Sequence, residues 1–474
     1  MSRLAVTGPG VAADPPWQAP PPPWQAPPPP WHALPLEERA RLVESGRIDL
    51  ADWRRQATAW AQTADSRYRA CVELRPPHGG DASIRVGVKD TVDVAGFATR
   101  LGLPRYRHYP TRSAAALGRV PARSINAKLV TTELSLGLEH GCVNPCFPHL
   151  DPAGSSTGCA VAVAAGICDL AMGTDTVASV RLPAGACGVV GLRVTHDPRL
   201  LDGMLQVSPL LDAPGWVARS ADDLAFLWRR HRLGQPPGAD QREPAGRFRV
   251  GVVQEALEDS LEPPVRGALN EVCDALAGNG HHLVPVRLGA LWRQRGLTYE
   301  LCTKAAWDRF RPGRGGIDDT LGESVRAALE VGAAVDGARH ERLLTELYAC
   351  RQAVSGRFQA QGVDLWLLPV GPLLPRDLRT TAPPASTIPQ PGAPDYWKRV
   401  SYAAIASLAG LPAITFPVAH SRSHQAPVVA QAIGPVRSDG RLIQFARTVG
   451  RLVGDLDFRL GGGVAAAAPR GGAP

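Results

Sequence analysis

The sequence is poor in lysine and contains no long hydrophobic run. These two features argue against particular classes of protein. It has four lysines, Lys89, Lys128, Lys304 and Lys398, so its 52 basic residues are almost all arginine. The arginines are scattered over the chain rather than gathered in one stripe. The net charge of +8 therefore does not predict nucleic-acid binding.

The hydrophobic residues indicate a globular protein without a membrane anchor. They make up 44% of the chain, which is enough for a sizeable core. No apolar run reaches the about 18 residues that a membrane span needs. The opening stretch MSRLAVTGPGVAADPP is too short, and too broken by glycine and proline, for a secretory signal. We therefore expect a cytoplasmic protein.

The nine cysteines do not have the spacing of a small disulfide-linked domain, and a cytoplasmic location implies free thiols. In EHGCVNPCFPH, the residues His140, Cys142, Cys146 and His149 are spaced like metal ligands. A zinc site is one interpretation, and a proline-broken loop with chance Cys and His is the other. Zinc ribbons carry a second Cys pair, which this sequence lacks. We predict no metal and no cofactor.

Composition divides the chain into three parts. Residues 1–35 contain a seven-residue repeat, PPWQAPP, PPWQAPP and PPWHALP, which favours an extended polyproline II tail. This tail is expected to be a disordered appendage, or alternatively an arm that docks a protein partner. Residues 461–474 are rich in glycine and alanine and are also expected to be disordered. Residues 36–460 are expected to form one domain.

Helical and strand patterns alternate within this domain, so we expect the α/β class. The apolar spacing predicts helices over 34–46, 49–71 and 263–280. Short apolar runs rich in β-branched residues predict strands over 84–89, 247–253, 281–288, 364–370 and 412–418. The Pro/Thr-rich stretch 380–394 is predicted to be a long surface loop.

Three serines lie in glycine-flanked turns around an apolar stretch. Ser155 and Ser156 open it, and Ser179 closes it. A serine hydroxyl is a poor nucleophile until a base removes its proton, and no histidine lies near these serines in a triad motif. A lysine is an effective base only when it is neutral, and burial favours the neutral form. Lys89 follows the apolar run IRVGV and is the lysine best placed for burial.

The segment GSSTG, continued by GTDTVASVRLPAGACGVVGLR, resembles the signature of the amidase signature family of serine hydrolases. The segment VGVKDTVDVAG resembles the sequence around the family's lysine. Two later segments, DAPGWVARSADDLAFL and IASLAGLPAITFPV, are similar to the family as well. The resemblance covers roughly residues 36 to 455. It implies a single large domain in which helices flank both faces of a mixed β-sheet.

The resemblance implies a catalytic triad of Ser179 as nucleophile, Ser155 as bridging serine and Lys89 as base. It also implies a cis peptide between Gly154 and Ser155. The oxyanion hole would consist of the backbone N–H groups of Thr176, Val177, Ala178 and Ser179. Ser156, Asp175 and Arg181 are expected to shape the surrounding loop.

The sequence departs from the family pattern at several positions. Val177-Ala178 replaces a glycine pair before the nucleophile, Ala153 replaces the first glycine before Ser155, and Thr157 replaces a glycine after Ser156. Lysine-proline has become Arg193-Val194. These changes indicate a reshaped pocket and leave the triad atoms in place.

Three functions remain as hypotheses. The favoured one is an amide hydrolase that releases ammonia or an amine from a small-molecule carboxamide. The second is an acyltransferase or amide synthase that uses the same Ser179 acyl-enzyme. The third is a non-catalytic scaffold. Leu182 stands where the tRNA-charging amidotransferases of the family have glutamine, which disfavours that role.

The sequence also suggests partners and residues that line the substrate site. Expected partners are the amide substrate and a second copy in a homodimer, without nucleic acid or membrane. Arg100, Tyr106 and Trp397 are candidate lining residues, with surface or core positions as the alternative.

Overall fold

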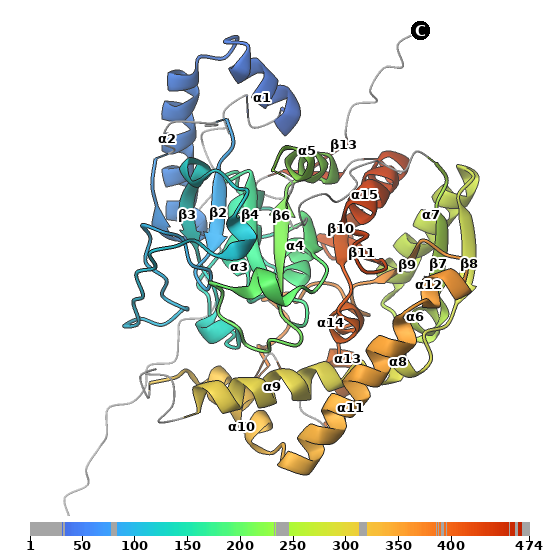
Figure 1. Ribbon diagram of the computed structural model, residues 1–474. Helices are drawn as coiled ribbons and strands as arrows, with labels where there is room; N and C mark the ends of the chain where they lie inside the picture. Colours follow the sequence, from blue (N-terminus) through green and yellow to red (C-terminus); the bar gives the residue numbers. More distant parts are fainter. Residues whose placement is uncertain are drawn as a thin grey trace, which may run out of the picture.

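The structure is a computed structural model, and it describes residues 31, 34–76, 83–231, 233, 246–311, 320–384, 386, 388–389, 393–394, 396–454, 456–459 and 463–466. One sheet of eleven strands crosses the molecule in the order β1-β3-β2-β4-β6-β5-β10-β11-β9-β7-β8 (Figure 1). Its strands are β1 (Cys71–Leu74), β2 (Val86–Lys89), β3 (Ile125–Leu129), β4 (Leu170–Asp175), β5 (Val190–Arg193), β6 (Ala213–Ala218), β7 (Arg249–Val253), β8 (His282–Val286), β9 (Leu365–Pro369), β10 (Ala413–Ser421) and β11 (Ala426–Ile433). Parallel pairs such as β2–β4 and antiparallel pairs such as β10–β11 both occur, so the sheet is mixed.

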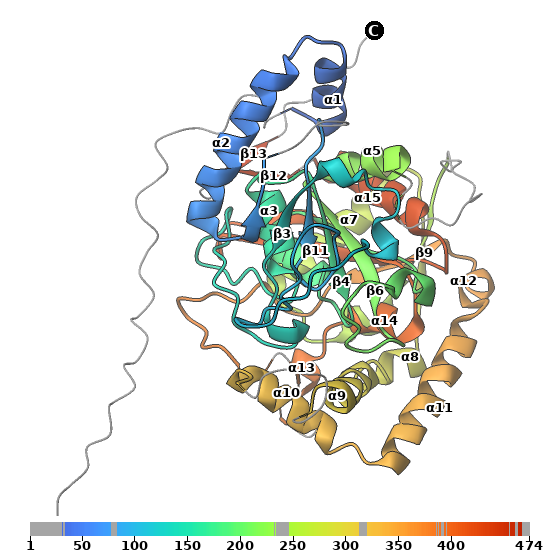
Figure 2. The same cartoon turned by 60° about the vertical axis from the view of Figure 1, so that its left-hand side comes forward.

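Helices surround this sheet. The α-helices are α1 (Leu36–Glu44), α2 (Leu50–Tyr68), α3 (Thr157–Ala164), α4 (Arg181–Ala186), α5 (Ala221–His231), α6 (Gln254–Glu258), α7 (Pro263–Gly278), α8 (Ala290–Arg293), α9 (Leu297–Phe310), α10 (Glu323–Ala333), α11 (Gly337–Val354), α12 (Arg357–Ala360), α13 (Tyr396–Arg399), α14 (Ala404–Ala409) and α15 (Asp439–Val453). Short 3₁₀ turns are η2 (Ala115–Leu117), η3 (Ala122–Ser124), η4 (Glu133–Ser135) and η5 (Pro198–Leu201). Helices α8 to α11 form one end of the molecule (Figure 2).

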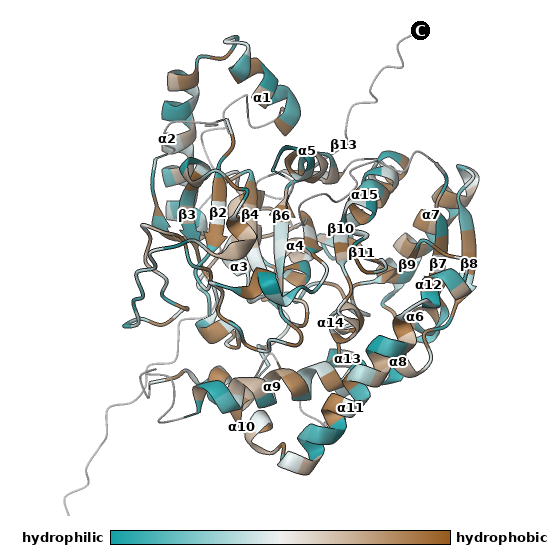
Figure 3. Cartoon of the chain, viewed as in Figure 1, coloured by the Kyte–Doolittle hydropathy of each residue, from teal (hydrophilic) through white to brown (hydrophobic). Residues whose placement is uncertain are grey.

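The sheet is covered on both faces, as the resemblance implied. Successive side chains of a strand point to opposite faces. On β10, Thr415 faces Gly185 of α4, whereas Phe416 packs edge-on against Phe445 of α15 at 6.2 Å between ring centroids. Helices α3 and α4 therefore lie on one face and α15 on the other. Apolar residues gather on the central strands, and the outer helices alternate between polar and apolar sides (Figure 3).

The predicted elements of the domain are confirmed, with small shifts at their ends. The helix expected over 49–71 ends at Tyr68 because Arg69 adopts a left-handed conformation with φ 53°. The loop expected over 380–394 is not wholly at the surface. In its described part, Ser386 and Ile388 are buried.

The structure differs from the predicted tails at both ends. Trp31 belongs to the proposed disordered tail, yet its side chain is buried against Trp53. Its indole N–H donates to Gln56, and Arg39 and Arg85 lie 5.6 and 5.1 Å from its ring centroid. The packed part of the chain therefore begins before residue 36, although the proline content of this segment predicts disorder. The partners that bury Trp31 come from other segments of the chain.

At the other end, β12 (Leu456–Arg459) pairs with β13 (Gly463–Ala466), which lies inside the tail predicted for 461–474. The first two repeats, with Trp17 and Trp24, and residues 467–474 lie outside the described residues. No helix in the described part is long and apolar enough to cross a membrane.

Candidate active site

The site forms where two parallel strands end at the same edge of the sheet. Strands β2 and β4 run side by side, with Val88 opposite Met172. Lys89 is the last residue of β2, and its side-chain nitrogen donates to Thr174 Oγ1 near the end of β4 at 2.9 Å. The same nitrogen lies 2.8 Å from Ser155 Oγ. The structure thus brings together the predicted base and the predicted bridging serine, which are 66 positions apart in the chain.

Lys89 is buried without a carboxylate in contact. Its side chain is fully buried, and burial lowers the pKa of Lys89 from 10.5 to about 8. The structure also contains a contrasting case. Lys128 is buried as well, but its ammonium lies 3.3 Å from a carboxylate oxygen of Asp90, which compensates part of the cost of burial. Lys89 lacks such a pair in the described part of the chain, and this favours its neutral form.

Ser155 and Ser156 lie directly before helix α3. The peptide between Gly154 and Ser155 is cis, as the resemblance implied. Ser156 occupies the N-cap position of α3, but its hydroxyl makes no capping bond there. It donates instead to the carbonyl of Thr174 at 3.2 Å. A Cβ atom on Gly173 would lie 2.7 Å from Ser156 Oγ, so glycine permits this close approach.

The Ser179 turn is tied to the same cluster through the backbone. The N–H of Ser156 donates to the carbonyl of Ser179 at 3.0 Å, and the Ser179 side chain is half-buried. Four consecutive backbone N–H groups precede or belong to this serine, those of residues 176–179. Within the described residues, none of the four donates to a protein acceptor. Buried N–H groups are nearly always paired, so this row is a ready set of donors.

Asp175 and Arg181 form a buried ion pair that stabilises the turn before Ser179. Both side chains are fully buried, and Arg181 donates to both carboxylate oxygens of Asp175 at 2.8 and 3.0 Å. Arg181 also donates to the carbonyl of Val177, at 2.9 Å, and to Ser407. The neighbouring guanidinium groups hold the pKa of Asp175 well below its usual range, although burial alone would raise it.

Two further residues contact this cluster, although neither of them was assigned a role in the site from the sequence. Arg193, one of the departures from the family pattern, donates to the carbonyl and the carboxylate of Asp175. Asp212 accepts a hydrogen bond from Thr176 Oγ1 at 2.7 Å, and burial raises the pKa of Asp212 to about 7. Asp212 is the first residue of the DAPG segment. An acidic residue within an apolar stretch is the sequence feature that could have identified it.

The four residues with metal-like spacing have protein partners. His140 lies 3.3 Å from a carboxylate oxygen of Asp151. The thiols of Cys142 and Cys146 donate to backbone carbonyls 3.1 and 3.4 Å away, and His149 lies against a third carbonyl. In the described ranges, no group of three or more His, Cys, Asp or Glu side chains is arranged to hold a metal ion.

The candidate lining residues lie in different places. Arg100 pairs with Glu73 at 2.9 Å and lies near Asp90, so it belongs to an ion-pair cluster. Tyr106 packs partly buried against the core. Trp397 on α13 is 50% exposed and packs edge-on against Tyr396. Trp397 is thus the candidate with a large exposed surface.

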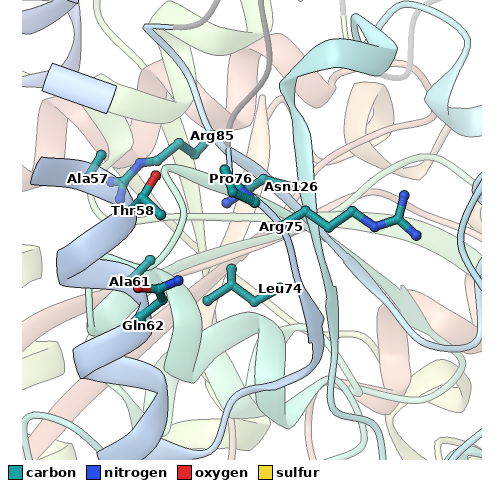
Figure 4. Close-up of a pocket in the computed structure, with 9 residues that line it drawn as sticks. All are labelled: Ala57, Thr58, Ala61, Gln62, Leu74, Arg75, Pro76, Arg85 and Asn126. Atoms are coloured by element: carbon teal, nitrogen blue, oxygen red, sulfur yellow. The ribbon is translucent and has the colours of Figure 1, made fainter. Parts of the chain in front are cut away.

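One pocket lies away from the catalytic candidates. It is a small hollow between α2 and the edge of the sheet (Figure 4). Its lining comprises Ala57, Thr58, Ala61, Gln62, Leu74, Arg75, Pro76, Arg85 and Asn126. None of these is a predicted site residue. The candidate site lies instead at Lys89 and Ser155, whose polar atoms are 2.8 Å apart, and Ser179 is joined to this cluster through its backbone carbonyl.

Comparison with known proteins identifies the family. A family model described as Amidase matches residues 53–443. One glutamyl-tRNA(Gln) amidotransferase subunit, from Thermus thermophilus, is 32% identical over 412 residues, which cover 77% of this chain and 83% of that protein. Mandelamide hydrolase of Pseudomonas putida is 26% identical over 436 residues, or 79% of this chain and 80% of that protein.

The solved structure of 6-aminohexanoate cyclic dimer hydrolase shares the fold. It superposes with a TM-score of 0.74 at 22% identity and covers 89% of this chain and 97% of its own. The family model spans most of the domain that the sequence motifs delimited. The chain therefore belongs to the amidase signature family, and the amidase-family relatives support an amide-hydrolysing enzyme.

Proposed function

We propose that this enzyme hydrolyses a carboxamide through an acyl-enzyme on Ser179, with Lys89 as the base and Ser155 as the relay. The observation that carries the proposal is the 2.8 Å contact between the Lys89 nitrogen and Ser155 Oγ. The nitrogen is fully buried and has no carboxylate partner within the described residues, and with a pKa of about 8 it is neutral in about one molecule in ten at pH 7.

The reaction would proceed in two halves. Neutral Lys89 accepts the proton of Ser155, Ser155 accepts the proton of Ser179, and the Ser179 oxygen attacks the amide carbon. The developing oxyanion accepts hydrogen bonds from the unpaired N–H groups of residues 176–179. Loss of one such donor typically costs about 2.7–4 kcal/mol of transition-state stabilisation. The proton then returns through Ser155 to the leaving amine, and water releases the acid by the reverse relay.

The surroundings of Ser179 favour a substrate that is apolar next to its carbonyl. Ala178, Val370, Ala403 and Val429 form a small apolar cluster, and Leu182 packs against it. Leu182 is the second residue of α4 and directly follows Arg181, which is held in the buried Asp175 network. An apolar wall at this place accommodates a hydrocarbon group more readily than the polar end of a glutamine.

Acyl transfer is the second candidate. The relative from Thermus thermophilus belongs to an amidotransferase, and transfer uses the same acyl-enzyme with an amine in place of water. Product analysis with hydroxylamine separates the two functions. A hydrolase releases ammonia and the free acid as main products, whereas a transferase diverts most of the acyl group to the hydroxamate.

Fluorophosphonate labelling tests the proposed nucleophile. We expect one phosphonate adduct per chain, and peptide mass spectrometry should locate it on Ser179. The Ser179→Ala variant should give no adduct, whereas Ser156→Ala should retain labelling because its hydroxyl only orients the loop. An adduct on another residue would refute the assigned nucleophile.

A further inference from the structure

One buried arginine has no carboxylate partner among the residues that the structure describes. In the described part of the chain, five arginine side chains are buried: Arg39, Arg85, Arg181, Arg193 and Arg295. The first four each lie 2.7 to 3.0 Å from a carboxylate of Asp169 or Asp175. Arg295, which is 3% exposed, has no ion pair among the described residues. Its charge is therefore buried without direct compensation.

The guanidinium of Arg295 is held by aromatic rings rather than by acceptors. It lies 4.3 Å from the ring centroid of Trp292, 4.8 Å from that of Trp397 and 5.7 Å from that of Tyr402. Among the described residues, the guanidinium makes one hydrogen bond, from Nη1 to the carbonyl of Trp292 at 2.8 Å. Its Nε is buried and has no partner in the same part of the chain. The nearby carboxylate of Asp259 accepts from Tyr402 at 2.7 Å instead.

This arrangement has the chemistry of an anion-binding group. Arginine stays protonated in proteins, and it carries five N–H donors in a rigid fork. A buried charge that lacks a partner is costly, and so are donors without acceptors. The fork matches the two oxygens of a carboxylate, and one guanidinium neutralises one carboxylate. The three rings lie 4.3 to 5.7 Å from the guanidinium carbon and restrict its position before a ligand arrives.

The Arg295 cluster adjoins the candidate active site through one segment. Tyr299 of α9 accepts a hydrogen bond from the N–H of Ser401 at 3.3 Å, and Ser401 Oγ donates to the carbonyl of Val370 at 2.8 Å. Val370 and Ala403 belong to the apolar cluster that contains Ala178, next to Ser179. Helices α8, α9, α13 and α14 gather at this end of the molecule in both views (Figures 1 and 2).

We propose that Arg295, with the rings of Trp292 and Trp397 beside it, is a binding site for a carboxylate. The carboxylate is carried by the amide substrate itself, at the end remote from the reacting carbonyl, or belongs to a free acid such as the product. The substrate assignment rests on the proposed amide hydrolysis, whereas binding of a carboxylate does not.

Tryptophan fluorescence tests the binding, since two indoles flank the guanidinium. The probes are glutaramate, which carries one carboxylate, and glutaramide, its neutral diamide. We expect a saturable change with glutaramate and none with glutaramide at the same concentrations. Arg295→Gln should weaken glutaramate binding at least about tenfold, as expected for loss of a charge-assisted bond. Arg293→Gln, an exposed arginine two residues away, should leave it unchanged.

Kinetics separate the two sources of the carboxylate. For a substrate site, ω-carboxy amides of one chain length should be hydrolysed with kcat/KM about 10- to 100-fold above that of the matched diamides, and Arg295→Gln should remove this preference. For a free acid, glutarate should bind while the two substrate classes react alike. Arg295→Lys keeps the charge but loses the fork, so it should bind glutaramate more weakly than the native protein.

Folding and the catalytic proposal are checked independently. Fluorophosphonate labelling of Ser179 should persist in Arg295→Gln, which shows that the nucleophile is intact. Labelling that fails in the native protein counts against the proposed function alone. Equal binding of glutaramate by the native protein and the Gln variant, or no binding of any carboxylate, would overturn the Arg295 site.

Discussion

The rate at which Ser179 is labelled should follow the titration of Lys89. Burial lowers the pKa of Lys89 from 10.5 to about 8. At pH 7 about one molecule in ten then carries the neutral amine, against about 0.03% for an unshifted lysine. Burial therefore raises the population of active base about 300-fold at pH 7. Below pH 8 the neutral fraction changes about tenfold per pH unit, and above it the fraction levels off.

The assay is the second-order rate constant of fluorophosphonate labelling between pH 6 and pH 10. The native enzyme should show a rise that levels off near pH 8. Lys89→Met should be slower by about 10²- to 10⁴-fold, the usual contribution of a general base, and should lose this pH dependence. Lys304→Met removes a lysine of α9 that pairs with Asp308, so it serves as the matched control with a native profile. A profile that is flat, or that survives in Lys89→Met, would refute the reasoning.

The same titration has a consequence for stability. The pKa of Lys89 is lower in the folded than in the unfolded protein, so between about pH 8 and pH 10.5 the unfolded chain binds more protons at this residue. The contribution of Lys89 to the free energy of unfolding should therefore rise with pH in this window, by at most about 1.4 kcal/mol per pH unit. Urea unfolding of the native protein and Lys89→Met should diverge accordingly. Parallel curves would contradict the shift.

Three further predictions concern the supports of the site and of the fold. Asp175→Asn leaves two buried guanidinium groups without their carboxylate and should cost about 3–5 kcal/mol in urea unfolding, whereas Asp377→Asn, at an exposed ion pair, should have little effect; equal losses would contradict the buried network. Ser156→Ala should cost about 1–3 kcal/mol because the buried carbonyl of Thr174 loses a donor, and unchanged unfolding would show that this bond is dispensable. Trp31→Ala should lower the free energy of unfolding by about 3–5 kcal/mol, and Trp31→Phe should lower it clearly less. An unchanged free energy of unfolding in the alanine variant would mean that Trp31 does not attach this segment to the domain.

The sequence was informative where local pattern decides structure. The strand ending in Lys89 and the helix over 263–280 could be predicted from apolar runs and the period of the apolar residues. The resemblance to the amidase signature then predicted which side chains meet, and the structure places Lys89 2.8 Å from Ser155. The family assignment agrees with the comparisons.

The features that the sequence did not predict depend on contacts between segments that are far apart in the chain. Asp212 contacts Thr176 only because β6 lies beside β4. Among the described residues, Arg295 has no ion pair because the nearby carboxylate of Asp259 accepts from Tyr402 instead. Trp31 stands in a proline-rich repeat that indicates disorder, yet Trp53 and two arginines from other segments bury it. The spacing of residues within one segment does not predict these long-range contacts.

The most direct test of the Lys89–Ser155 relay is the titration of Lys89 itself. The chain has four lysines, so protein labelled with ¹³C at lysine Cε should give four NMR signals, assigned with single Lys→Arg variants. The account predicts that the Lys89 signal titrates with a midpoint near pH 8. A Lys89 midpoint at or above pH 10 would mean that the amine is charged during catalysis, and the proposed base would be wrong.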